Sequence, residues 1–139
     1  MQRSAGDPIL TMAHVDTLGA VVAEIKSNGR LRLSPVGGFN ANNAEAHNCR
    51  VYTYDGQIYE GTIQLADASL HVNKEYSTTQ RTFQSVEVVL DEPVTSKDDV
   101  KALGITNGCF VCADPNLVVT NSGYIKSRFL DDKLSAAIL

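Results

Sequence analysis

Two dipeptides in the middle of the chain, Asn28-Gly29 and Asp55-Gly56, constrain the fold more than any other feature. Both residues of such a pair tolerate the positive φ angles of a tight two-residue turn, so each pair predicts a β-hairpin. The flanking stretches have strand composition. They are residues 21–25 and 30–33 around the first turn, and residues 51–54 and 57–63 around the second. Short strands joined by tight turns indicate a small barrel or sandwich.

The rest of the middle region continues this β-rich pattern and adds one helix. Residues 69–72 and 85–90 are two further strand candidates, and residues 35–38 form a turn or bulge. Ser96 can cap a short helix, Asp99 stands at the capping-box position, and Gly104 suits the residue after the helix. We therefore expect a β-domain with one short helix.

The two ends of the chain differ from the middle. Residues 8–13 are almost continuously apolar, which is typical of a strand buried on both faces of a parallel sheet. Residues 117–119 predict a strand, and residues 133–139 predict the first turns of an apolar helix. Because that helix stops on apolar residues, we expect a truncated chain. Three parts are therefore expected: an α/β-type segment at 1–18, a β-barrel-like domain at 19–111 and a second α/β-type segment at 112–139.

Composition excludes several function classes. The 139 residues carry a net charge of -4 and 12 scattered basic residues, with no basic patch, so nucleic acid is not an expected partner. The apolar runs are too short to span a bilayer. Residues 1–4 and the short apolar stretch after them do not form a secretory signal. With three cysteines, an odd number, we expect reduced thiols and a cytoplasmic protein.

Two short motifs could carry chemistry. His14 and Asp16 are two residues apart, so in a strand they point the same way, and a carboxylate on one ring nitrogen commonly orients a metal-binding histidine. An ordinary His–Asp pair is the more frequent outcome for such a motif alone. In the second motif, Asp131 precedes Asp132 just before a helix. Its carboxylate could bridge two cations, or the pair could instead cap the helix and favour its dipole.

Other reactive side chains carry weaker signals. Cys109 and Cys112 match C-x-x-C, but Phe110 and Val111 favour a strand, in which residues three apart face opposite sides. With the distant Cys49, they are interpreted as three buried or idle thiols. In the sequence, His47 and His71 have no carboxylate or thiol at ligand spacing, and Ser127 and Ser135 have no nearby base. Tyr52, Tyr54 and Tyr59 alternate around a hairpin, which favours packing over a sugar platform.

Taken together, residues 12–19, 35–39 and 125–133 resemble the glutamyl-aminopeptidase family, which includes the tetrahedral (TET) aminopeptidases. Residues 91–108 follow the same family pattern in order, so the resemblance covers essentially the whole chain. It implies an α/β catalytic domain interrupted by a barrel-like domain used in dimerisation. The expected fold class is therefore mainly β, with a small β-barrel-like lid or dimerisation domain flanked by incomplete pieces of an α/β metallopeptidase domain.

The same resemblance implies a site for two divalent metal ions, zinc or cobalt. His14 is then a ligand, Asp16 orients it, and Asp131 bridges the metals, followed by Asp132 across a bond that is cis in related sites. Thr17 departs from the Glu of many members, which leaves the subgroup and substrate open. The family's general base and remaining ligands lie beyond the Asp-Asp motif. We therefore expect this chain alone to be inactive, to bind metal weakly or not at all, and to have a trans Asp131–Asp132 bond.

The leading functional hypothesis is part of an aminopeptidase that removes N-terminal residues from peptides and self-associates as a dimer or higher oligomer. One alternative is a non-catalytic dimerisation or assembly module. Another is a glucanase-type glycoside hydrolase, which needs two carboxylates flanking the bond. Apart from the metal-motif acids, the sequence shows no such pair.

Overall fold

The computed structural model describes Gly6 and residues 8–139. The charged start at residues 1–4 lies outside the described part. The chain forms two compact units, Leu18–Asp114 and a second unit made of Met1–Thr17 with Pro115–Leu139. Among the described residues, no helix is long and apolar enough to cross a bilayer.

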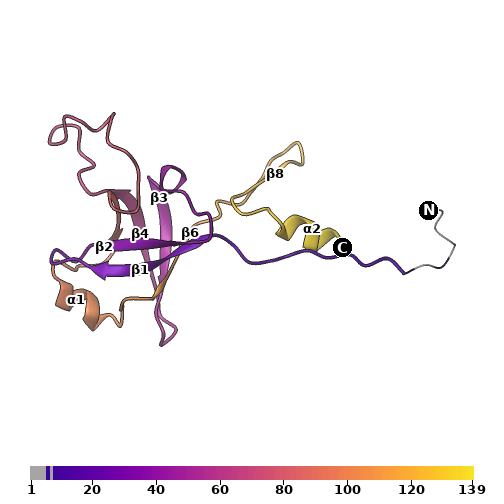
Figure 1. Cartoon of the computed structure of the whole chain (residues 1–139), viewed down its shortest axis with the longest axis horizontal. Helices are drawn as coiled ribbons and strands as arrows, with labels where there is room; N and C mark the ends of the chain where they lie inside the picture. Colours follow the sequence, from indigo (N-terminus) through magenta and orange to yellow (C-terminus); the bar gives the residue numbers. More distant parts are fainter. Residues whose placement is uncertain (1–5, 7) are drawn as a thin grey trace. The chain divides into compact units, whose positions relative to one another are not determined.

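Leu18–Asp114 is a closed six-stranded barrel in which every neighbouring pair of strands is antiparallel (Figure 1). The strand order around the barrel is β1-β2-β5-β4-β3-β6. The strands are β1 Gly19–Ile25, β2 Leu31–Val36, β3 His47–Tyr52, β4 Ile58–Leu65, β5 Val86–Leu90 and β6 Phe110–Ala113. The expected mainly β fold with a small barrel is confirmed.

Both predicted hairpins are present. β1 and β2 are joined through Asn28-Gly29, where Gly29 has φ 80° and its N–H donates to the carbonyl of Lys26 at 3.0 Å. β3 and β4 are joined through Asp55-Gly56, where Gly56 has φ 87°. Positive φ is the conformation in which a side chain is disfavoured, so glycine specifies both turns.

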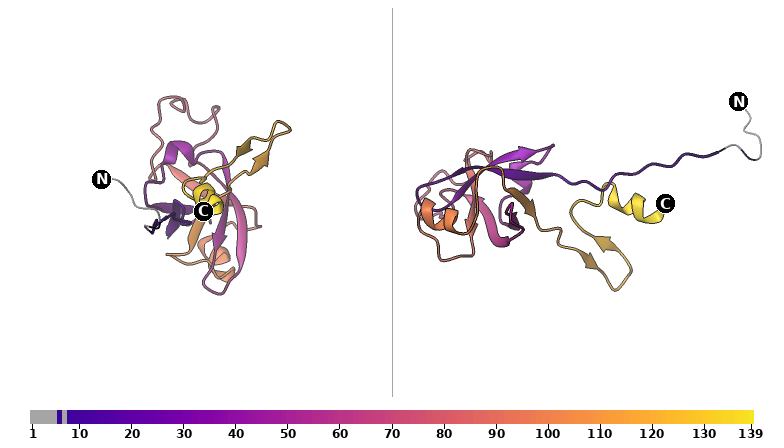
Figure 2. Two further views of the ribbon diagram at one scale, coloured as in Figure 1. Left: turned by 90° about the vertical axis from the view of Figure 1, so that its right-hand side faces the viewer. Right: turned by 90° about the horizontal axis from the view of Figure 1, so that it is seen from below.

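The barrel closes along two short seams. β1 pairs with β6 at Ala20↔Val111 and Val21↔Phe110, and β2 pairs with β5 at Leu31↔Val88 and Arg32↔Glu87. Figure 2 shows the barrel from two further directions. Alternate residues of all six strands fill its interior, as expected for a barrel too narrow to leave a channel. The largest fully buried strand side chains are Val22, Leu31, Leu33, Val51, Ile63, Leu65, Val86, Val88 and Val111.

The connection from β5 to β6 contains the predicted helix, α1 Lys97–Ala102. Ser96 accepts a hydrogen bond from the Asp99 N–H, and the Asp99 carboxylate accepts from the N–H groups of Thr95 and Ser96. These hydrogen bonds lower the pKa of Asp99, and the bond from Thr95 contributes most. Gly104 follows with φ 81°. The predicted capping box and helix end are therefore confirmed.

The connection from β4 to β5, residues 66–85, contains no strand, so the strand predicted at residues 69–72 is wrong. Arg81 organises this segment instead. Its guanidinium donates to the Glu45 carboxylate at 2.7 Å and to the carbonyls of Tyr76 at 2.8 Å and Thr79 at 2.6 Å, and it lies over the Tyr76 ring. Within residues 69–72, the Ser69 carbonyl accepts from the N–H groups of Val72 at 3.1 Å and Asn73 at 2.8 Å, so local turns occupy backbone groups that a strand would pair with a neighbour.

The second unit contains a two-stranded ribbon of β7 Val118–Val119 with β8 Ile125–Lys126, and the short helix α2 Lys133–Ile138. The predicted strand near residue 118 and the helix after Asp132 are confirmed. Residues 8–13 do not form the predicted doubly buried strand, and Ile9, Leu10 and Met12 are exposed. A strand of a parallel sheet exists only when neighbours pair with it, and the described residues supply none.

Candidate metal centre

His14 and Asp16 lie on the extended segment that leads into the barrel. Nδ1 of His14 is 3.2 Å from Oδ1 of Asp16, because residues two apart in an extended chain project to the same side. When the neutral imidazole carries its proton on Nδ1, it donates to Asp16 and leaves the Nε2 lone pair free to bind a metal ion. The pair therefore has the geometry of a metal-binding histidine with an orienting carboxylate.

Asp131 approaches the other ring nitrogen. Its Oδ1 is 3.5 Å from Nε2 of His14, although the two residues are far apart in the sequence. The side chains of His14, Asp16 and Asp131 are 53%, 88% and 95% exposed, so this group of three is open to solvent. The structure thus brings together the three residues that the resemblance assigned to one site.

The turn before Asp131 is held by Pro115. The Arg128 N–H donates to the Pro115 carbonyl at 2.7 Å, and the Ser127 hydroxyl lies 3.0 Å from the same oxygen. Phe129 has φ 59°, a left-handed conformation that is uncommon for a bulky residue. Ser127 therefore has a structural role in this turn, consistent with the absence of a nearby base in the sequence.

Asp132 occupies the N-cap position of α2, but its side chain makes no capping hydrogen bond. The alternative in which Asp131 itself caps the helix is not what the structure shows. The Asp131–Asp132 peptide bond is cis, so the expectation of a trans bond was wrong.

These donors fit part of a divalent metal site. An imidazole nitrogen and a carboxylate oxygen are ligands that zinc and related ions accept. No cluster of three or more His, Cys, Asp or Glu able to hold a metal ion occurs among the described residues. Because a structural zinc site needs about four ligands and a catalytic one about three, the described residues supply a partial set.

The other reactive residues lie apart from this group. Cys49 and Cys109 are buried, Cys112 is half-buried, and all three are free thiols. Burial raises the pKa of Cys49 to about 12 and also raises that of Cys112. His71 lies exposed in the 66–85 connection and not in a strand. Tyr52 and Tyr59 are half-buried, whereas Tyr54 is exposed, so the packing role expected for Tyr54 is wrong.

Solved aminopeptidases share this fold. The aminopeptidase APDkam598 of the archaeon Desulfurococcus kamchatkensis matches with a TM-score of 0.76 and 24% identity, over 91% of this chain and 33% of that chain. The TET1 peptidase of Pyrococcus horikoshii, described as able to assemble into a tetrahedron or a large octahedral shell, matches with a TM-score of 0.70 and 27% identity. That match covers 91% of this chain and 38% of that one.

Sequence comparison gives the family. The model of the M42 glutamyl aminopeptidases matches residues 2–139, and the chain belongs to this family. YhfE of Bacillus subtilis (strain 168), whose name assigns it provisionally to the aminopeptidases, is 48% identical over 127 residues. That alignment covers 91% of this chain and 37% of YhfE. The chain thus spans about a third of the length of the proteins it matches.

Proposed function

We propose that this chain forms part of a metal-dependent aminopeptidase, in which His14 and Asp131 are metal ligands and Asp16 orients His14. The observation that carries the proposal is the contact of both His14 ring nitrogens with carboxylates, Nδ1 with Asp16 at 3.2 Å and Nε2 with Asp131 at 3.5 Å. Family membership supports it, because the match extends over both segments that carry these residues.

A divalent ion bound here would supply an activated water and polarise the carbonyl next to a peptide's N-terminus. The chain's own residues prepare the site for it. Asp16 holds the imidazole so that Nε2 faces Asp131, and the Pro115-anchored turn holds Asp131. We assign the Asp131 carboxylate a bridging role between two ions, because its two oxygens can bind one ion each. Asp132 follows it as a supporting residue.

We further propose that the chain alone does not turn over peptides and binds zinc or cobalt weakly. Two ligands provide less than the usual set of three or four. Among the described residues, no group of three or more His, Cys, Asp or Glu side chains is placed to hold a metal ion. The free, partly buried thiols support a cytoplasmic location.

Metal titration tests these roles. Isothermal titration of the chain with Zn²⁺ should show weak binding that His14→Ala abolishes, whereas His71→Ala, in the 66–85 connection, leaves it unchanged. In the native polypeptide that carries these residues, Asp16→Asn should lower metal affinity by about 10–100-fold. In the same native polypeptide, hydrolysis of aminoacyl-p-nitroanilides that persists after the double substitution His14→Ala and Asp131→Asn would contradict the assignment.

We also propose self-association through the outer face of the barrel. Tyr52 of β3 pairs with Ile58 of β4 and Phe110 of β6, and Phe110 pairs with Val21 of β1. Directly paired residues point to the same face, so these four side chains form one row, called the outer row. Ile58 and Phe110 are exposed. An apolar row across four strands is a candidate protein contact surface, and the partner proposed is a second copy.

Sedimentation of the chain at increasing concentration tests this second proposal. Phe110→Ser should shift the population towards monomer, and Leu70→Ser, an exposed apolar residue outside the outer row, should not. A wild-type chain that remains monomeric at high concentration would refute the outer row as a contact surface and leave the metal-site proposal intact.

A further inference from the structure

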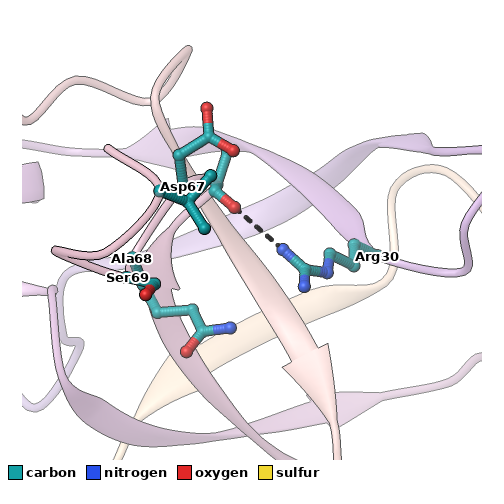
Figure 3. Close-up of a pocket in the computed structure, with 7 residues that line it drawn as sticks. Arg30, Asp67, Ala68 and Ser69 are labelled. Atoms are coloured by element: carbon teal, nitrogen blue, oxygen red, sulfur yellow. Dashed lines mark hydrogen bonds between the residues drawn. The ribbon is translucent and has the colours of Figure 1, made fainter. Parts of the chain in front are cut away.

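A hollow of about 300 Å³ opens on the outside of the barrel where β4 ends and the 66–85 connection begins (Figure 3). This volume is at the lower end of the range for small-molecule sites. Polar groups come from Arg30, Gln64, Asp67 and Ser69, and Val72 with two alanines supplies apolar surface. None of these residues belongs to the unit that carries His14 and Asp131.

One edge of the Arg30 guanidinium is fixed by the protein. Nη1 donates to the Ala66 carbonyl at 3.0 Å, the bond drawn in Figure 3, and to Oε1 of Glu87 at 2.5 Å. In the described part of the chain, Nε and Nη2 have no hydrogen-bond partner, and the side chain is 34% exposed. These two N–H groups form the parallel fork that binds both oxygens of a carboxylate.

The charge at this face favours a monoanion. Glu87 is 3% exposed and also accepts from Nζ of Lys26 at 2.6 Å, so one carboxylate faces two cations and one positive charge remains. Asp67 brings a carboxylate to the wall of the hollow, and within the described residues no ion pair joins it to Arg30. With Asp67 counted, these four groups carry no net charge, so the hollow has no excess positive charge for a dianion, and a single carboxylate is held by the hydrogen bonds of the Arg30 fork.

Further donors line the same hollow. Gln64 lies on the outer face of β4, because its neighbours Ile63 and Leu65 are buried inside the barrel. Its carboxamide can donate to an oxygen. The Ser69 hydroxyl accepts from the His71 N–H at 3.3 Å and retains its own proton for donation. The backbone N–H groups of Ala68 and Ser69 have no acceptor among the residues that the structure describes.

We propose that this hollow is a binding site for a carboxylate monoanion with a small apolar substituent, held by the free edge of Arg30. Gln64 and Ser69 donate to the carboxylate, and the Val72 side chain contacts the substituent. A peptide C-terminus and a small free carboxylic acid share this chemistry. A phosphate dianion is disfavoured by Asp67.

Titration of the chain followed by ¹H–¹⁵N NMR tests the proposal at the Arg30 Nε–H signal. N-acetyl-L-alanine should shift this signal saturably in the millimolar range, and N-acetyl-L-alaninamide, which lacks the charge, should not. Tighter binding of N-acetyl-L-alanine than of acetate indicates a peptide C-terminus, and equal binding indicates a small free acid. Inorganic phosphate should bind more weakly than N-acetyl-L-alanine.

Arg30→Lys retains the charge that faces Glu87 but removes the fork, and should weaken binding about tenfold or more. Because that substitution could also disturb the barrel, Gln64→Ala provides a second test that leaves the Glu87 ion pairs untouched, and it should weaken binding several-fold. Arg50→Lys, on β3 away from the hollow, is the matched control and should bind normally. Equal shifts with the amide, or unchanged affinity in both Arg30→Lys and Gln64→Ala, would overturn the proposal.

Discussion

Glu87 is a buried carboxylate on β5, and its two cationic partners come from the β1–β2 hairpin. Lys26 donates to it at 2.6 Å and Arg30 at 2.5 Å. A buried carboxylate without such partners would be strongly destabilising. Since β2 and β5 are paired at two positions only, Leu31↔Val88 and Arg32↔Glu87, these ion pairs reinforce a short seam of the barrel.

Glu87→Gln should therefore destabilise the barrel by about 3 kcal/mol, because two cations lose their shared buried anion. Urea unfolding followed by circular dichroism measures the change. The matched control is Glu24→Gln, which breaks the exposed pair of Glu24 with Arg32 and should have little effect. Equal effects of the two substitutions would show that burial does not decide the contribution of this carboxylate.

The Cys49 thiol should be unreactive in the folded protein. Burial raises its pKa to about 12, so almost no thiolate exists at pH 8, and the side chain is inaccessible. Iodoacetamide labelling followed by peptide mass spectrometry should modify the half-buried Cys112 before Cys49. All three thiols should react once urea unfolds the chain. Labelling of Cys49 at the unfolded-state rate in buffer would contradict this prediction.

At the scale of elements, Gly61 on β4 allows the backbones of β4 and β5 to approach each other closely. A Cβ at this position would lie 2.6 Å from the Val89 carbonyl oxygen on the neighbouring strand β5. Because that oxygen belongs to the backbone of the ladder, it cannot move without disturbing the pairing of β4 with β5. Glycine is thus required here for space and not for a positive φ angle.

Gly61→Ala should destabilise the barrel by about 1–3 kcal/mol through this overlap. Gly38→Ala is the matched control, since a Cβ at Gly38 meets nothing within 4 Å and its φ is not positive. The two thermal unfolding midpoints, measured by calorimetry, should therefore separate clearly. A Gly61→Ala midpoint at or above that of Gly38→Ala would disprove the steric argument.

The cap of α1 should make stability depend on pH. Hydrogen bonds from Thr95 and Ser96 lower the pKa of Asp99 in the folded state. Its contribution is therefore fully present above its ordinary pKa, near 3.9, and is lost as pH falls through the folded value. Asp99→Asn should lower the free energy of unfolding at pH 7, and the difference from wild type should shrink towards pH 3. Asp98→Asn, which removes a contact with Lys101 only, should not show this dependence.

At the scale of the whole molecule, the two compact units differ in how much structure supports them. Leu18–Asp114 contains the closed barrel and the buried side chains of the core. In the other unit, β7, β8 and α2 have no fully buried residue, and large apolar side chains such as Leu117, Val119 and Ile138 are exposed. Backbone hydrogen bonds without a packed core open readily.

Hydrogen exchange should therefore be slow in the barrel and fast in the second unit. Backbone amides in the β1–β2 and β3–β4 hairpins should be protected for far longer than those of residues 134–139, because α2 is six residues long and buries none of them. Exchange measured by mass spectrometry at pH 7 tests this difference. Protection of residues 134–139 equal to that of the hairpins would show that tertiary contacts hold α2 as firmly as the barrel holds its strands.

The sequence alone determined the local elements. Gly29 and Gly56 specify their turns because one residue at positive φ suffices in each, and Ser96 with Asp99 specifies the start of α1 through bonds within one turn. The same local logic places Asp16 beside His14. The approach of Asp131 to His14 was expected through the family resemblance and not from the spacing of the residues.

Only the tertiary structure decided which distant residues meet. The order β1-β2-β5-β4-β3-β6, the burial of Glu87 and the irregular course of residues 66–85 all depend on partners remote in sequence. Composition at residues 69–72 and 8–13 favoured strands, yet a strand forms only where a neighbour offers its backbone groups. In the first segment the Ser69 carbonyl accepts from the N–H groups of Val72 and Asn73 instead, and among the described residues no strand pairs with the second.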